Sequence, residues 1–204
     1  MEALYKYKKE VKSLSRERIW MELKRILSVP EPQHVFSIMI EEGILDEVLP
    51  PIEVEGLSKV VTAEKEYSVS PSHLIRLFSL NKSIGKNWVH YVSLTSNEAK
   101  ILEFIKESLA HYKELKTVAY KFGRGVAEGW LLNSCDGSFD VIPGKISEII
   151  NTGCNAFFPI SGVDLLEEME EGPELGRQME RLEKLWIKSG FKMSKEELLS
   201  KSKN

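Results

Sequence analysis

The sequence predicts an all-α protein of about ten helices. Two observations support this: apolar residues recur at helical spacing along most of the chain, and residues that start or stop helices separate these segments. Only the segment 89–94, VHYVSL, alternates as a strand would, and it does so weakly between two helical segments. The predicted fold is therefore an array of helices.

The first predicted helix spans residues 15–27. Ser15 is a suitable N-cap, and apolar side chains then recur on one face at Ile19, Leu23, Ile26 and Leu27. Pro30 and Pro32 end this helix and open the next, because proline suits the first turn of a helix but not its interior. The second helix stops at Gly43, a residue suited to the position just after a helix end.

Breaks and caps mark the later helices. Leu49-Pro50-Pro51 interrupts the chain, and Ser70-Pro71 is expected to start another helix. Capping boxes, in which two residues three apart bond each other's backbone, are predicted at Thr95–Glu98 and Ser194–Glu197, with a looser version at Ser161–Asp164.

The composition is that of a soluble globular protein. Of 204 residues, 42% are hydrophobic and 29% charged, which is enough for a core in one or two domains. No apolar run approaches the roughly 20 residues that span a bilayer, and the N-terminus lacks the apolar stretch of a signal peptide. Cys135 and Cys154 form no C-x-x-C pair, so we expect unreactive thiols and a cytoplasmic protein.

The net charge of −3 is unevenly distributed along the chain. Residues 1–25 hold eight basic and four acidic side chains, and residues 184–204 hold six lysines and two glutamates, so the segment between them is strongly acidic. Basic ends on an acidic body are compatible with RNA held at selected places, but lysine-rich termini also serve solubility alone. Charge alone leaves both interpretations open.

No catalytic constellation emerges from the sequence. The four histidines are widely spaced and form no metal-binding motif. Asp136 and Asp140 are four residues apart in a turn-like segment, whereas two-metal nucleotidyl transfer uses two carboxylates close together, usually as D-x-D on a strand. No D-x-D is present, so we predict that the chain is inactive by itself.

Two stretches of the chain carry a characteristic order of residues. In the first, residues 14–50, these are Ser15, Glu17, Arg18, Ile19, Glu22, Leu23, Glu41, Gly43, Leu45, Leu49 and Pro50. In the second, residues 158–199, they are Phe158-Pro159, Gly162, Asp164-Leu165-Leu166, Gly172-Pro173, Leu175-Gly176, Leu182-Glu183, Trp186 and Glu197-Leu198-Leu199. Both stretches resemble the bacterial class II tRNA nucleotidyltransferase and poly(A) polymerase family. A family glycine before Gly172 is missing, and residues 57–150 match only as generic helices.

The resemblance implies an elongated neck-body-tail array without the catalytic head. Residues 1–56 would form the neck, 57–157 the helical body and 158–204 the tail. The family's Gly-Gly…Arg-Asp, D-x-D and Glu-Asp-x-x-Arg motifs are absent from this chain. Mg²⁺ and CTP or ATP would therefore belong to a head supplied elsewhere, either upstream in a longer chain or as a separate polypeptide, and no cofactor is expected here.

Two groups of charged residues are candidate contact sites. Arg18, Glu22 and Arg25 share one face of the first helix and, by resemblance, would contact the head; a plain solvated face is the alternative. Basic residues of the tail would hold RNA through its phosphates, again with solvation as the alternative; they are Arg177, Arg181, Lys184, Lys188 and Lys192.

These inferences support one leading hypothesis and one alternative. The leading hypothesis is a portion that binds and positions a tRNA or another RNA 3′ end, for CCA addition or 3′ adenylation by a head domain. The alternative is a stand-alone helical interaction module with no role in nucleotidyl transfer. The sequence does not distinguish CCA addition from poly(A) tailing.

Overall fold

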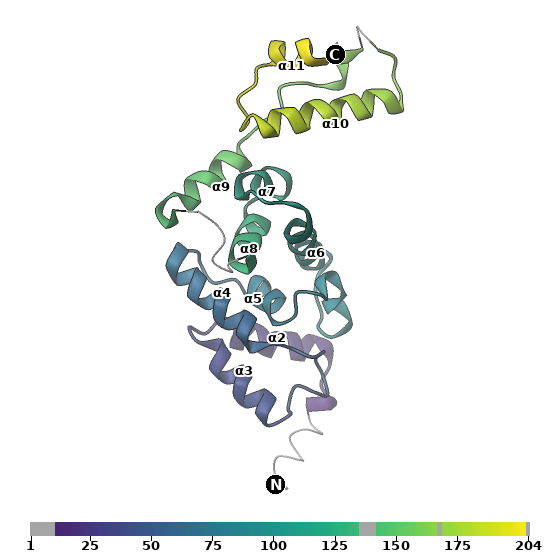
Figure 1. Ribbon diagram of the computed structural model, residues 1–204. Coiled ribbons are helices and arrows are strands. Elements are labelled where there is room, and N and C mark those ends of the chain that lie inside the picture. The colour runs from purple at the N-terminus through teal and green to yellow at the C-terminus, as the bar shows by residue number, and fades with distance from the viewer. Residues whose placement is uncertain (1–10, 135–141, 167–168, 203–204) are drawn as a thin grey trace. The chain divides into compact units, whose positions relative to one another are not determined.

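A computed structural model describes residues 11–134, 142–166 and 169–202, and these are arranged as two compact units (Figure 1). The first unit comprises Met1–Cys154 and the second Asn155–Asn204. Helices and connecting turns make up the described residues, with no strand among them, which confirms the predicted all-α array.

The first unit carries most of the helices. In chain order they are α2 (Arg16–Leu27), α3 (Pro32–Glu41), α4 (Val54–Tyr67), α5 (His73–Leu80), the 3₁₀ helix η1 (Gly85–His90), α6 (Ser96–His111), α7 (Leu115–Phe122), α8 (Arg124–Ser134), the 3₁₀ helix η2 (Pro143–Lys145) and α9 (Ile146–Cys154). The second unit contains the 3₁₀ helix η3 (Gly162–Leu165), α10 (Pro173–Lys188) and α11 (Lys195–Ser202).

The predicted caps are present. The hydroxyl of Ser15 accepts a hydrogen bond from the backbone N–H of Arg18, at 3.4 Å between the two heavy atoms. All three predicted boxes, Thr95–Glu98, Ser161–Asp164 and Ser194–Glu197, make both reciprocal bonds. These features are local, so the sequence is sufficient to predict them.

Two local expectations differ from the structure. Helix α5 begins at His73 and not at Ser70-Pro71, because Ser72 has an extended backbone and acts as the residue before the first turn. The weak strand pattern at 89–94 overlaps the end of η1, and the rest of it forms a turn and irregular backbone.

Close backbone approach shapes the core of the first unit, in which α6, α7, α8 and α9 pack together (Figure 1). Gly153 of α9 lies so near α7 that a β-carbon there would meet the carbonyl oxygen of Lys116. Large side chains fill the interior, among them Trp88 and Trp130. Helix α4 and helix α2 add to the same core.

The second unit has a small core centred on Trp186. The indole packs against Phe158 and Phe191, with ring centroids 5.5 Å and 4.7 Å away. Leu182 of α10 and Leu198 of α11 are also fully buried. Helix α10 therefore turns its apolar side inward, as its sequence predicts.

Candidate nucleic-acid interface

Helix α2 has one buried and one exposed face. Ile19, Trp20, Leu23 and Leu27 are buried in the core of the first unit. The opposite face presents Arg18, Met21, Glu22 and Arg25, all exposed, with Met21 54% accessible. The three charged residues predicted to contact a head domain thus share an outward surface.

On this outward face the charges interact with each other and not with the body. Arg25 donates from Nη1 to Oε1 of Glu22 at 2.9 Å, one helical turn away. Arg18 makes no ion pair with any described residue. Such an exposed pair within one helix contributes only about 0.2–0.5 kcal/mol, so it offers little resistance to a partner that competes for it.

The remaining charges of α2 attach it to the rest of the first unit. Arg16 donates from Nη1 to the carbonyl oxygen of Val89 at 3.0 Å, and the hydroxyl of Ser93 donates to Oε1 of Glu17 at 3.4 Å. These contacts link the start of α2 to η1 and the turn after it. Together with Lys24, three of the six charged residues of α2 therefore hold the helix against the rest of the first unit.

A second polar cluster joins α2 to α5 and α6. Lys24 lies 3.7 Å from Oε1 of Glu98 and 4.9 Å from the centroid of the Trp20 ring. His73 packs edge-on against the same ring, with centroids 5.5 Å apart. Partial burial, followed by the nearby Lys24 ammonium, lowers the pKa of His73, which favours its neutral form.

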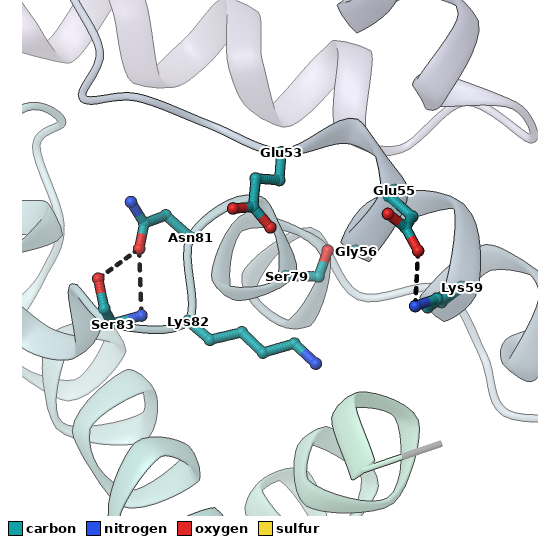
Figure 2. Close-up of a pocket in the computed structure, with 8 residues that line it drawn as sticks. All are labelled: Glu53, Glu55, Gly56, Lys59, Ser79, Asn81, Lys82 and Ser83. Atoms are coloured by element: carbon teal, nitrogen blue, oxygen red, sulfur yellow. Dashed lines mark hydrogen bonds and ion pairs between the residues drawn. The ribbon is translucent and has the colours of Figure 1, made fainter. Parts of the chain in front are cut away.

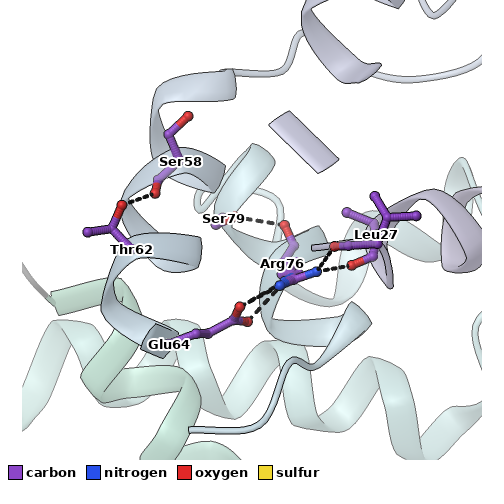
Figure 3. Close-up of polar contacts among 7 residues, drawn as sticks. Leu27, Ser58, Thr62, Glu64, Arg76 and Ser79 are labelled. Carbon is purple, nitrogen blue, oxygen red and sulfur yellow. Dashed lines mark hydrogen bonds and ion pairs between the residues drawn. The ribbon is translucent and has the colours of Figure 1, made fainter. Parts of the chain in front are cut away.

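A buried ion pair, absent from the sequence-based predictions, fixes the other end of α2. Arg76 of α5 and Glu64 of α4 are 2% and 4% exposed and pair with each other (Figure 3). Arg76 also donates to the carbonyl oxygens of Leu27 and Val29. A signal was available: Arg76 stands in the middle of the apolar segment HLIRLFSL. Since an arginine is rarely buried without a partner, that position indicates a polar network in the core.

The basic residues predicted to hold RNA lie on α10 and just after it, and all five are exposed. Two of them pair with glutamates of the same helix. Arg177 contacts Glu174 and Lys184 contacts Glu180, each with 2.6 Å between nitrogen and oxygen. These five residues, called the stripe below, are therefore accessible, but two of their charges are neutralised within the helix.

The other three residues of the stripe differ in their surroundings. Arg181 donates from Nε to Gln178 and from Nη2 to the carbonyl oxygen of Lys201, so it holds the end of α11. Lys188 and Lys192 make no ion pair with a described residue. The C-terminal end of α10 is thus the part of the stripe with the most available positive charge.

A pocket of about 440 Å³ lies where the start of α4 meets the end of α5 (Figure 2). Its lining comprises Glu53, Glu55, Gly56, Lys59, Ser79, Asn81, Lys82 and Ser83. Glu55 pairs with Lys59 at 2.7 Å, and Lys82 donates to the carbonyl oxygen of Asn133 at 2.7 Å. With two carboxylates and two ammonium groups, the pocket has no net attraction for phosphate.

Metal-binding clusters and membrane-spanning helices are both absent from the residues that the structure describes. Among them, no three or more metal-binding side chains gather at one place. Across the same ranges, no helix combines the length and the apolar character that crossing a bilayer requires. Asp136 and Asp140, the acidic pair considered above, lie outside the described residues.

Comparison with known proteins adds an independent view of the same segments. Residues 1–55 match a family model described as the probable RNA- and SrmB-binding site of polymerase A. The chain is also 26% identical over 217 aligned positions to the mitochondrial CCA tRNA nucleotidyltransferase 1 of Mus musculus. That alignment covers 98% of this chain and 48% of the mouse enzyme.

The two matches agree with the resemblance carried by residues 14–50 and 158–199. The chain spans about half the length of the curated relative it matches. Both findings confirm that this chain resembles the tRNA nucleotidyltransferase and poly(A) polymerase family, and they are consistent with a C-terminal portion of such an enzyme.

Proposed function

We propose that this chain is the RNA-binding portion of a tRNA nucleotidyltransferase or poly(A) polymerase relative. The observation that carries the proposal is the family match over residues 1–55, the segment whose helix α2 presents Arg18 and Arg25 outward. The similarity to a CCA-adding enzyme over nearly the whole chain supports the same role. The chain would hold an RNA 3′ end where a head domain, supplied elsewhere, adds nucleotides.

The chemistry of the proposed contact is electrostatic. Guanidinium and ammonium groups neutralise phosphates and release counterions, which gives affinity with little dependence on sequence. The exposed residues of α10, together with Lys192, provide such groups in the second unit. A tRNA suits this recognition because double-stranded RNA is read mainly through its shape and backbone.

The role of this chain in the reaction would be to bind and orient the substrate. Holding a reactant in a productive geometry is itself a large contribution to rate. Mg²⁺ and the incoming nucleotide would be bound by the head. No described part of the body engages Arg18, Glu22 or Arg25, so this face of α2 is available to that head, and its two arginines are also available to phosphates of the RNA that the head receives.

A stand-alone interaction module is the second candidate, and one observation favours it. Phe157 and Val163 of the second unit are apolar side chains that are 84% and 72% exposed. Exposed apolar side chains suit contact with another protein better than contact with RNA phosphates. Under this proposal the chain would not assist nucleotidyl transfer.

Replacing the stripe tests the RNA contact. The triple variant Arg177→Ala, Lys184→Ala and Lys188→Ala removes three exposed cations and keeps Arg181, which holds α11. We expect weaker tRNA binding, and a plot of log affinity against log salt whose slope decreases by about 2, since each phosphate contact contributes roughly 0.7–0.9.

The matched control is Lys59→Ala on α4, which removes a lysine that pairs with a glutamate four residues away, as Lys184 does. This variant should bind tRNA as the original chain does. An unchanged salt slope in the triple variant would show that the stripe is only a solvated face.

A further inference from the structure

The end of α2 is held by a side chain from another helix. The last carbonyl groups of an α-helix have no partner within it and must find one elsewhere. Nη1 of Arg76 donates to the carbonyl oxygen of Leu27 (Figure 3). It also donates to the carbonyl oxygen of Val29, at 2.8 Å. One guanidinium nitrogen thus closes the C-terminus of α2.

The opposite edge of the same guanidinium is held by Glu64. Nε lies 3.0 Å from Oε1, and Nη2 lies 2.6 Å from Oε2, so the contact is bidentate. A planar guanidinium with five donors can make this arrangement, whereas a lysine ammonium cannot. Arg76 therefore connects α2, α4 and α5 through one buried group.

The position of this pair relative to the family match is informative. Leu27 and Val29 lie within the matched residues 1–55, while Glu64 and Arg76 lie outside them. The other polar contacts of α2 with the body, through Arg16, Glu17 and Lys24, are made by more exposed side chains. The buried pair is thus the best shielded polar link between the matched segment and the body.

We infer that Arg76 and Glu64 are positioning residues that hold α2, and with it Arg18 and Arg25, in the orientation needed to bind RNA. This inference rests on the proposed RNA-binding function. Neither residue contacts RNA itself, because both are buried. Their effect is transmitted through the two carbonyl groups at the end of α2.

The test separates positioning from general stability. Arg76→Met alone would leave the Glu64 carboxylate buried without a partner and could unfold the chain, whereas replacing a buried pair by apolar residues of similar size is often neutral or stabilising. The double variant Arg76→Met with Glu64→Leu is therefore expected to fold. It nevertheless lacks a donor for the carbonyl groups of Leu27 and Val29.

Hydrogen exchange and RNA binding are measured on the full chain. In the double variant, amides of α2 should exchange roughly tenfold faster, the loss expected for hydrogen bonds from a charged donor, while those of α6 should not change. Affinity for a tRNA lacking its terminal CCA should fall roughly three- to tenfold, because part of the binding free energy is then needed to hold α2 in place. The salt slope should stay the same, since no phosphate contact is removed.

Arg25→Ala is the comparison variant, because it removes an outward cation and should decrease the salt slope by roughly 0.7–0.9. Arg76→Lys is the second variant if the double variant does not fold. It keeps a cation beside Glu64 but loses the planar set of guanidinium donors, so it should also give faster exchange in α2 and weaker RNA binding. Unchanged α2 exchange, or faster exchange with unchanged RNA affinity, would overturn the inference. If the original chain binds no RNA, both the proposed function and the positioning of RNA are wrong. Hydrogen exchange of the α2 amides then still shows whether the Arg76–Glu64 pair holds α2 in place.

Discussion

Individual charged side chains of α2 fall into two groups according to what they touch. Arg16, Glu17 and Lys24 contact the body of the first unit. Arg18, Glu22 and Arg25 face outward. The inward group fastens the helix, and the outward group is available to a partner. The mixture of charges along this helix thus reflects two different tasks.

Asp164 provides a pH prediction at the scale of one residue. Its carboxylate accepts from Nζ of Lys195 at 2.6 Å and from the N–H and hydroxyl of Ser161 at 2.9 Å. The hydrogen bond from Lys195, followed by those from Ser161, lowers the pKa of Asp164 from 3.8 to about 2. A lowered pKa means that the ionised form is favoured in the folded state.

The stabilisation from Asp164 should be complete above pH 4 and should disappear as the pH falls from about 4 to about 2. Over this interval we expect amides of α11 to lose protection from exchange, because Lys195 begins that helix. In Asp164→Asn, the protection should be lower at pH 7 and should depend less on pH. Identical acid profiles for the two proteins would contradict this assignment.

Packing between helices gives a prediction at the scale of elements. Gly153→Ala places a β-carbon against the backbone of α7, which cannot move aside as a flexible side chain would. We expect a loss of about 1–3 kcal/mol in the free energy of unfolding, the usual cost of overpacking. Thermal or urea unfolding followed by circular dichroism measures it.

Gly125→Ala is the control for this substitution. Gly125 also lies in a helix, α8, but no atom stands within 4 Å of the added carbon. Alanine favours helix over glycine by up to about 1 kcal/mol, so this variant should be slightly more stable. If both variants lost the same stability, close approach between α7 and α9 would not be the cause.

The helices also differ in how far the sequence alone predicts their contacts. Caps such as Ser15 and Thr95 depend on residues three apart, so their pattern was sufficient. The stripe on α10 was predictable as a helical face, and its pairing with Glu174 and Glu180 follows from the same periodicity. The pair of Arg76 with Glu64 was missed because it depends on how three helices pack, which no local spacing encodes.

At the scale of the whole molecule, the chain forms two units and aligns with about half of a CCA-adding relative. The first unit contains the matched segment with its outward cations, and the second contains the stripe on α10. Under the proposed function, each of these basic surfaces would contact RNA phosphates. Each would contribute affinity without reading sequence.

The most direct test of this account is the binding of the unmodified chain to a tRNA lacking its terminal CCA, compared with an unrelated RNA hairpin over a series of salt concentrations. We predict tighter binding to the tRNA, with an affinity that falls steeply as salt rises. Equal binding to both RNAs, or no binding to either at moderate salt, would contradict the claim that this chain holds tRNA.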